Sequence, residues 1–192
     1  MDLPNTRRVS IDDLKPEVSR NAAFVDFWRD TMVFPDRVAL RSDFVAERIP
    51  SLWSNLLLHD LSSGDDDVLR LVGTAVVERF GRDPTGTSYL DFVRPERREP
   101  ALKSLLGSVH QPCGMLGLID WVYASGKRER IESVGFPMWR TADGDGFFLL
   151  FCNHVLDAPV FDFSYRDPEH RFSYAEIVAR TWIDVGFGTV GA

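Results

Sequence analysis

The chain has 192 residues, which at roughly 100–200 residues per domain is the length of one domain with extensions. Hydrophobic residues make up 44% and charged residues 27%, so the composition excludes disordered, collagen-like and coiled-coil chains. The 22 Lys and Arg residues against 29 Asp and Glu residues give a net charge of −7, which argues against nucleic acid or an anionic membrane as a partner, because both bind basic surfaces.

The two cysteines, Cys113 and Cys152, are too few for a disulfide scaffold, so we expect both to be reduced. The first 18 residues carry charges throughout and resemble no secretory signal, and no run approaches about 18 apolar residues. These features predict a cytoplasmic protein with no membrane association.

Residues 1–36 are expected to form a helical extension, with a weak capping box over residues 10–13 and a helix over residues 24–32. Phe24, Phe27 and Trp28 lie on one stripe of that helix, and Pro35 ends it. This stripe must be covered, either by the protein's own sheet or by a second copy in a homodimer, and these three aromatic residues are the candidate dimer interface. A short helix is predicted over residues 43–49, capped by Ser42.

Two strands are predicted over residues 52–61 and 68–74, joined by a Ser-Ser-Gly-Asp-Asp-Asp turn. Helices over residues 75–80 and 95–109 follow, and then a meander of strands over residues 115–124, 129–141 and 147–156. The last strand is apolar at odd and even positions alike, which indicates that both faces of the sheet are covered. A capping box at Ser173-Tyr-Ala-Glu176 predicts one short helix over residues 174–183.

Several motifs carry a family resemblance. The stretches Arg70-Leu-Val-Gly-Thr74, Phe80-Gly-Arg-Asp-Pro-Thr-Gly86 and Tyr89-Leu-Asp-Phe-Val93 resemble a PAS domain. Together with Leu40-Arg41, Ile49-Pro50 and Leu58-His-Asp60, they resemble a PAS-like family of unassigned function found in alphaproteobacteria. The resemblance covers residues 37–157 and leaves residues 158–192 as a C-terminal extension with one short helix.

The resemblance implies an α+β fold: a five-stranded antiparallel sheet with crossover helices on one face, a cavity between them and a sensory role. Flavin-binding light sensors of this family carry a reactive Cys after the Gly-Arg turn, where this chain reads Asp83-Pro-Thr-Gly86, so covalent flavin is not expected. His110 lies at the end of the crossover helices in an unmatched context, so haem is not expected either.

The cavity of such a fold would be lined from the sheet by Trp121, Tyr123, Phe136, Met138, Phe148 and Leu150. Arg70 is a further candidate, because an arginine within an apolar strand needs an anion, either a ligand or Asp60 on the paired strand. The favoured interpretation is the structural ion pair with Asp60.

Possible metal ligands are weaker signals, and no metal site is expected. His110 with Cys113 supplies fewer ligands than zinc usually takes. Cys152 and His154 with His59 would form a His/His/Cys site if their strands are neighbours, but a histidine anchored to the backbone at a sheet edge is the favoured interpretation. Residues 143–146 lack the Glu of a calcium loop, and residues 65–67 are typical of a solvated turn. The basic run Arg94, Arg97, Arg98 and Lys103 is interpreted as a solvated helix face.

We therefore predict a non-catalytic PAS-type sensory or regulatory module from a bacterium. It would form a homodimer, bind a small apolar or carboxylate ligand, and signal to a separate protein by protein–protein interaction. The alternative is a small cone-shaped isomerase or dehydratase-like enzyme, with His59, Asp120 or His154 as acid or base in its pocket.

Overall fold

The computed structural model describes residues 6–156 and 172–191, and the predicted boundary at residue 157 falls outside the described residues. Its helices are α1 (Ser19–Thr31), α2 (Thr74–Phe80) and α3 (Pro95–His110). Its strands are β1 (Thr6–Ser10), β2 (Leu56–Asp60), β3 (Val68–Val72), β4 (Cys113–Tyr123), β5 (Arg128–Trp139), β6 (Phe147–Val155) and β7 (Phe172–Asp184). Short 3-10 turns are η1 (Ile11–Asp13), η2 (Arg41–Asp43), η3 (Ala46–Arg48), η4 (Pro50–Asn55) and η5 (Tyr89–Phe92).

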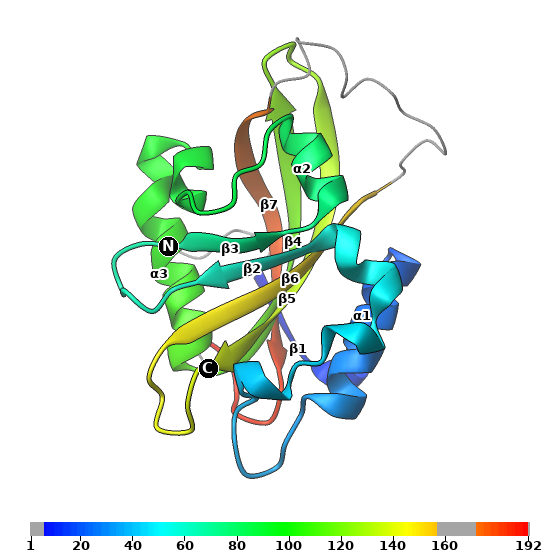
Figure 1. Ribbon diagram of the computed structural model, residues 1–192, viewed down its shortest axis with the longest axis vertical. Helices are drawn as coiled ribbons and strands as arrows, with labels where there is room; N and C mark the ends of the chain where they lie inside the picture. Colours follow the sequence, from blue (N-terminus) through cyan, green and yellow to red (C-terminus); the bar gives the residue numbers. More distant parts are fainter. Residues whose placement is uncertain (1–5, 157–171, 192) are drawn as a thin grey trace.

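All described strands belong to one curled sheet in the order β1-β7-β4-β5-β6-β2-β3 (Figure 1). The hairpin β2–β3 joins the meander β4–β5–β6 through an antiparallel pairing of β2 with β6. This is the five-stranded arrangement that the PAS resemblance implies. The count is higher because β7 adds to the free edge of β4 and β1 pairs in parallel with β7.

Helix α1 covers one face of the sheet. Phe24 and Trp28 are fully buried, and the Trp28 ring stacks on Phe136 of β5 at 4.8 Å between centroids. Phe136, Met138, Leu150 and Cys152 alternate along β5 and β6 toward this helix, because side chains two residues apart share a face of a strand. The aromatic stripe is thus covered by the chain's own sheet.

The crossover between β3 and β4 covers the opposite face. Val76 and Phe80 of α2 and Leu105 of α3 pack on the intervening residues of the same strands, such as Leu149 and Phe151 of β6. In Figure 1, α3 lies across the sheet from α1. The prediction that both faces are covered is therefore confirmed.

Most predicted elements are present with shifted ends, but the prediction of a helix in the C-terminal segment is wrong. Residues 174–183 belong to strand β7, not to a helix. Ile177, Val178 and Thr181 are β-branched and Tyr174 and Trp182 aromatic, which favours a strand once an unpaired edge is available. Pairing with the whole length of β4 outweighs the local capping signal, so the C-terminal segment extends the sheet.

The predicted helix over residues 43–49 is two 3-10 turns, η2 and η3, and the first half of the predicted strand over residues 52–61 is η4. Gly73 of the family-like motif lies beside η4. A Cβ atom at Gly73 would be 2.3 Å from the carbonyl oxygen of Trp53, so this contact admits only glycine. Gly81, which follows the last residue of α2, has the left-handed φ of +71°.

Among the described residues, no helix combines the length and apolar character needed to cross a membrane.

Candidate functional site

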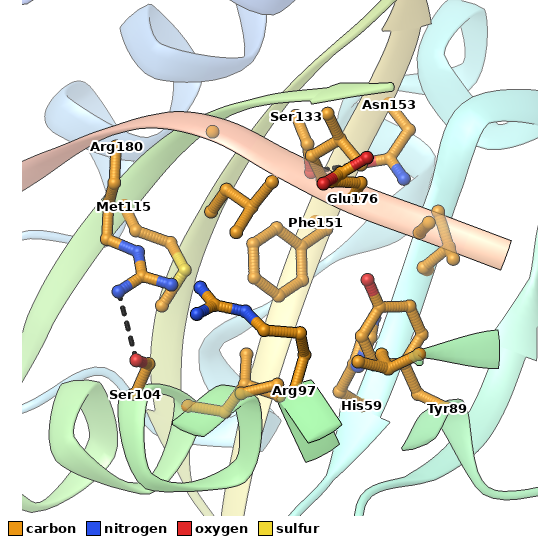
Figure 2. A pocket seen from close by; sticks show the side chains of 18 of the residues that line it. His59, Tyr89, Arg97, Ser104, Met115, Ser133, Phe151, Asn153, Glu176 and Arg180 are labelled. Carbon is orange, nitrogen blue, oxygen red and sulfur yellow. Dashed lines mark hydrogen bonds between the residues drawn. The ribbon is translucent and has the colours of Figure 1, made fainter. Parts of the chain in front are cut away.

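A cavity of about 120 Å³ lies between α3 and the concave face of the sheet (Figure 2). Its apolar floor and walls come from β2, β4, β6, β7, α3 and η5: Leu57, Tyr89, Val93, Pro100, Ala101, Leu105, Met115, Gly117, Ile119, Trp121, Phe151, Ala175 and Ile177. Its polar lining consists of His59, Arg94, Arg97, Ser104, Ser133, Asn153, Glu176 and Arg180. An apolar pocket with a few convergent polar groups is the usual form of a small-molecule site.

A glycine of β4 forms part of the cavity wall. Gly117 of β4 is paired with Ser133 of β5 and Arg180 of β7, and all three residues line the cavity. A Cβ atom at Gly117 would lie 3.6 Å from the Ile119 side chain, at ordinary contact distance. The space that a side chain at position 117 would fill is therefore part of the cavity.

A buried histidine–carboxylate pair lies at one side of the cavity. His59 Nδ1 is 2.8 Å from Asp67 Oδ2, and the two residues are 4% and 0% exposed. A carboxylate accepts hydrogen bonds, so His59 Nδ1 is the donor in this contact. The hydrogen bonds found for the His59 ring within the described part of the chain involve Nδ1, and the ring lines the cavity.

Tyr89 packs against this pair. The His59 ring meets the Tyr89 ring edge-on at 5.2 Å, and burial raises the pKa of Tyr89 above its usual value, with the negative charge of Asp67 adding to the shift. Tyr89 therefore remains a neutral phenol. On the neighbouring strands, the Ser133 hydroxyl donates to Asn153 Oδ1.

Arginines gather at the mouth. The Arg94 guanidinium donates to the Tyr174 hydroxyl and stacks 4.1 Å from the centre of that ring, which joins the start of α3 to β7. Arg180 Nη1 donates to Ser104 Oγ at 2.9 Å, and Arg97 reaches from the first turn of α3 toward the same space (Figure 2). Glu176 is the opposing charge, and its carboxylate lies 3.9 Å from Arg128.

A bulge aims Arg180 at the cavity. On β7, Ile177 pairs with Ile119 while Ala179 pairs with Leu118, so Val178 is an extra residue opposite β4. In a regular strand, the period of two would place Arg180, three residues after Ile177, on the opposite face. With the bulge, Arg180 pairs with Gly117 and both line the cavity.

Of the sheet residues predicted to line the cavity, Trp121 lines it, whereas Phe136, Met138, Phe148 and Leu150 lie on the opposite face with α1. This corrects their strand parity, which sequence alone did not determine because both faces are apolar. Tyr123 is buried in the core of the cavity face but is not part of the lining. Its hydroxyl donates to Glu129 at 2.7 Å.

Arg70 also lies away from the cavity. A bulge separates the pairs Leu58–Leu71 and His59–Leu69, which leaves Arg70 unpaired in the ladder. Its side chain is 56% exposed, and Nε donates to Asp60 Oδ2 at 2.9 Å. The structure shows the ion pair with Asp60 that the sequence favoured.

The candidate dimer interface is corrected at Phe24 and Trp28. Both side chains lie inside the core of their own chain and are unavailable to a second copy. Phe27 is partly buried against Phe44 at 6.0 Å between ring centroids. This helix is amphipathic because it covers its own sheet.

The candidate metal ligands do not converge. Cys152 and His154 face α1, whereas His59 faces the cavity, so the sheet separates them. His110 is exposed, and Cys113 is buried with its pKa raised to about 11 by burial. No group of three His, Cys, Asp or Glu side chains within the described ranges is arranged to hold a metal ion.

Of the acid or base candidates for the enzyme alternative, His59 alone lines the cavity. Asp120 is held by Arg130, with Nη2 at 3.1 Å, and is not part of the lining. His154 is on the α1 face, where Nδ1 lies 2.9 Å from Asn21 Oδ1. The partner of His59 is Asp67, from the acidic turn that the sequence had suggested to be solvated.

Sequence reasoning missed the polar half of the cavity. Arg97, Ala101, Ser104 and Leu105 follow the spacing of one helical stripe on α3, so the exposed arginine at its start lies on the side of the helix that faces the cavity. That spacing could have identified Arg97 as a cavity residue from the sequence. The contribution of β7 was hidden by the wrong assignment of that segment.

The sequence matches no protein-family model and no curated protein. Among solved structures, it is similar to a variant of Drosophila melanogaster Cycle PAS-B with bound glycerol, at 12% identity and a TM-score of 0.42, covering 53% of this chain and 98% of that one. It is also similar to VqmA bound to DPO, at 20% identity and a TM-score of 0.43, covering 60% of each chain. A third likeness is the Vibrio cholerae VqmA dimer without target DNA, at 19% identity and a TM-score of 0.42, covering 59% of this chain and 52% of that one.

The sequence-based exclusion of nucleic acid is wrong. The Vibrio cholerae protein is described as giving insight into the DNA-binding mechanisms of LuxR-type receptors. A net charge of −7 is an average over the chain and does not exclude a local basic surface.

Proposed function

We propose that this chain is a PAS-type sensory module that takes up a small molecule in the cavity between α3 and the sheet and passes the change on to a separate protein. The observation that carries the proposal is the cavity itself, of about 120 Å³, with an apolar floor and a few convergent polar groups. A side chain missing at Gly117 keeps it open, although valine or isoleucine would suit the middle of a strand better.

The test compares the purified protein with Gly117→Val by native mass spectrometry beside the denatured masses. We expect the wild type to carry a small molecule that is released on denaturation, and Gly117→Val to be empty, because the valine side chain occupies the same space. The variant should be at least as stable as the wild type to heat, since valine favours a strand and fills a void.

Leu118→Ile is the matched control, because Leu118 is the next residue of β4 and faces the other side of the sheet. This variant should carry the same molecule as the wild type. An identical adduct on Gly117→Val would contradict the proposal. The proposal would also be contradicted if the wild type is empty and gains no thermal stability from acids, amides and alcohols that are the size of one aromatic ring.

A second candidate function, acid–base catalysis, is favoured by one specific observation, the buried His59–Asp67 pair at 2.8 Å beside the cavity. A histidine oriented by a carboxylate is the arrangement of a general base. Mass spectrometry of the molecules released from the wild type and from His59→Gln separates the two functions. A sensor releases the same compound from both proteins, whereas a catalyst releases product from the wild type and substrate from the variant.

A further inference from the structure

Arg97 is an exposed cation at the mouth of the cavity, with no ion pair to any of the described residues. It lies in the first turn of α3, and Figure 2 shows its guanidinium directed into the cavity between Phe151 and Arg180. Among the described residues, none forms a salt bridge or a side-chain hydrogen bond with Arg97. A guanidinium directed at an apolar pocket is suited to bind the anionic group of a ligand.

The other charges at the mouth leave an excess of positive charge. Arg94 lies 4.0 Å from Glu96 and is bound to the Tyr174 hydroxyl. Glu176 has Arg128 within 3.9 Å. Three arginines and one glutamate line the cavity, so a chain with a net charge of −7 presents a locally positive entrance here.

The interior sets the size and character of what can enter. Phe151, Ile119 and Trp121 give it an apolar floor and wall, and His59 provides a polar end. Its volume of about 120 Å³ is close to that of the engineered cavity of about 150 Å³ that binds benzene. The body of the ligand is therefore about the size of one ring.

We propose that the cavity selects a ring-sized organic acid, whose apolar body lies against Phe151 and whose carboxylate pairs with Arg97 at the mouth. This inference rests on the proposed function and adds the chemical class of the ligand. A planar carboxylate matches the fork of a guanidinium, and the apolar interior disfavours a phosphate or a second charge inside the cavity.

The test uses isothermal titration calorimetry on the full chain after dialysis to remove bound small molecules, with benzoate, benzyl alcohol and inorganic phosphate as separate probes. We expect benzoate to bind the wild type more tightly than benzyl alcohol, and phosphate not to bind. Arg97→Gln should weaken benzoate binding about tenfold or more, the effect of losing a charge-assisted hydrogen bond, and change benzyl alcohol binding less than about twofold.

Lys103→Gln removes an equal charge from an exposed position of the same helix that does not line the cavity, and it should leave both affinities unchanged. Equal binding of benzoate and benzyl alcohol that Arg97→Gln does not alter would overturn the inference and leave the proposed function standing. Arg97-dependent binding of phosphate alone would overturn the carboxylate assignment. Absence of binding by any probe would overturn the inference, while the comparison with Gly117→Val decides the proposed function independently.

Discussion

His154 is buried under α1 in a position that penalises its charged form. Its Nε2 atom has no hydrogen-bond partner among the described residues, and its Nδ1 atom lies 2.9 Å from Asn21 Oδ1. Burial lowers the pKa of His154 to about 4, and the positive charges of Arg79 and Arg20 contribute to the decrease. In an unfolded chain the pKa of a histidine is about 6.5. The unfolded state therefore takes up a proton between these two values, and the folded state loses stability as the pH falls through them.

We expect His154→Gln to remove this pH dependence. Between pH 7.5 and 5, the free energy of unfolding of the wild type should fall by about 2 kcal/mol more than that of the variant, since one proton contributes about 1.4 kcal/mol per pH unit. Urea unfolding at the two pH values measures the difference. Carboxylates contribute equally to both proteins, so parallel pH profiles would show that His154 is not the responsible group.

At the scale of single residues, the sequence identified Arg70 with Asp60 and Trp121, but it could not assign the faces of β5 and β6. Strand parity is read from alternating polarity, and here Ile131 and Val134, on opposite faces, are equally apolar. Asp67 was missed for a different reason. Its burial depends on His59, which is eight residues away across a hairpin, and an acidic turn carries no sign of that contact.

Helix α1 begins without a side-chain cap of its own, because its N-cap residue is Val18. Strand β5 provides the cap. The Glu132 carboxylate accepts the backbone N–H groups of Glu17 at 2.7 Å and Val18 at 3.0 Å, and also the Asn21 amide at 2.9 Å. A buried carboxylate at the positive end of a helix thus fixes how α1 enters the sheet surface.

Glu132→Gln should destabilise the protein by about 1–3 kcal/mol, because an amide offers one acceptor oxygen in place of two and carries no charge. Urea unfolding measures the loss, and hydrogen exchange should show the first turn of α1 opening more often. Glu17→Gln is the matched control, since it removes an exposed carboxylate at the same helix end but keeps the backbone donor. Equal losses in the two variants would contradict a specific role for Glu132.

Among the elements, α1, α3 and the β4–β6 meander were predictable because each combines a clear period with a recognisable turn. Strands β1 and β7 were not, because both exist through pairing with partners distant in sequence. The residues of β7 fit a helical stripe and a strand equally well. The free edge of β4 decides between them, and that edge is a property of the assembled sheet.

At the scale of the whole molecule, one sheet carries two cores. Alternate residues of β5 and β6 pack against α1 on one side and line the cavity face on the other, so neither layer is independent of the other. Strand β1 completes this sheet by covering residues 180–184 of β7, and Arg8 donates to the carbonyl oxygens of Val190 and Gly191. It protects an edge that would otherwise present unpaired backbone groups.

Deletion of residues 1–10 should therefore lower stability and cause concentration-dependent association through the exposed edge of β7. Analytical ultracentrifugation over a wide concentration range measures the association. Deletion of residues 1–5 is the matched control, because β1 begins at Thr6 and remains intact. If both truncated proteins sediment like the full chain, β1 does not protect the edge.

The extra residue at Val178 has a consequence for comparing this protein with homologues. Arg180 lies three residues after Ile177 and faces the cavity only because Val178 bulges out of the ladder. A homologue with one residue fewer between these two positions would have no bulge, and its arginine, two residues after the isoleucine, would face the cavity as well. A one-residue gap in an alignment at Val178 is therefore compatible with a cation at the cavity, whereas an arginine at the three-residue spacing faces the cavity only where the bulge is kept.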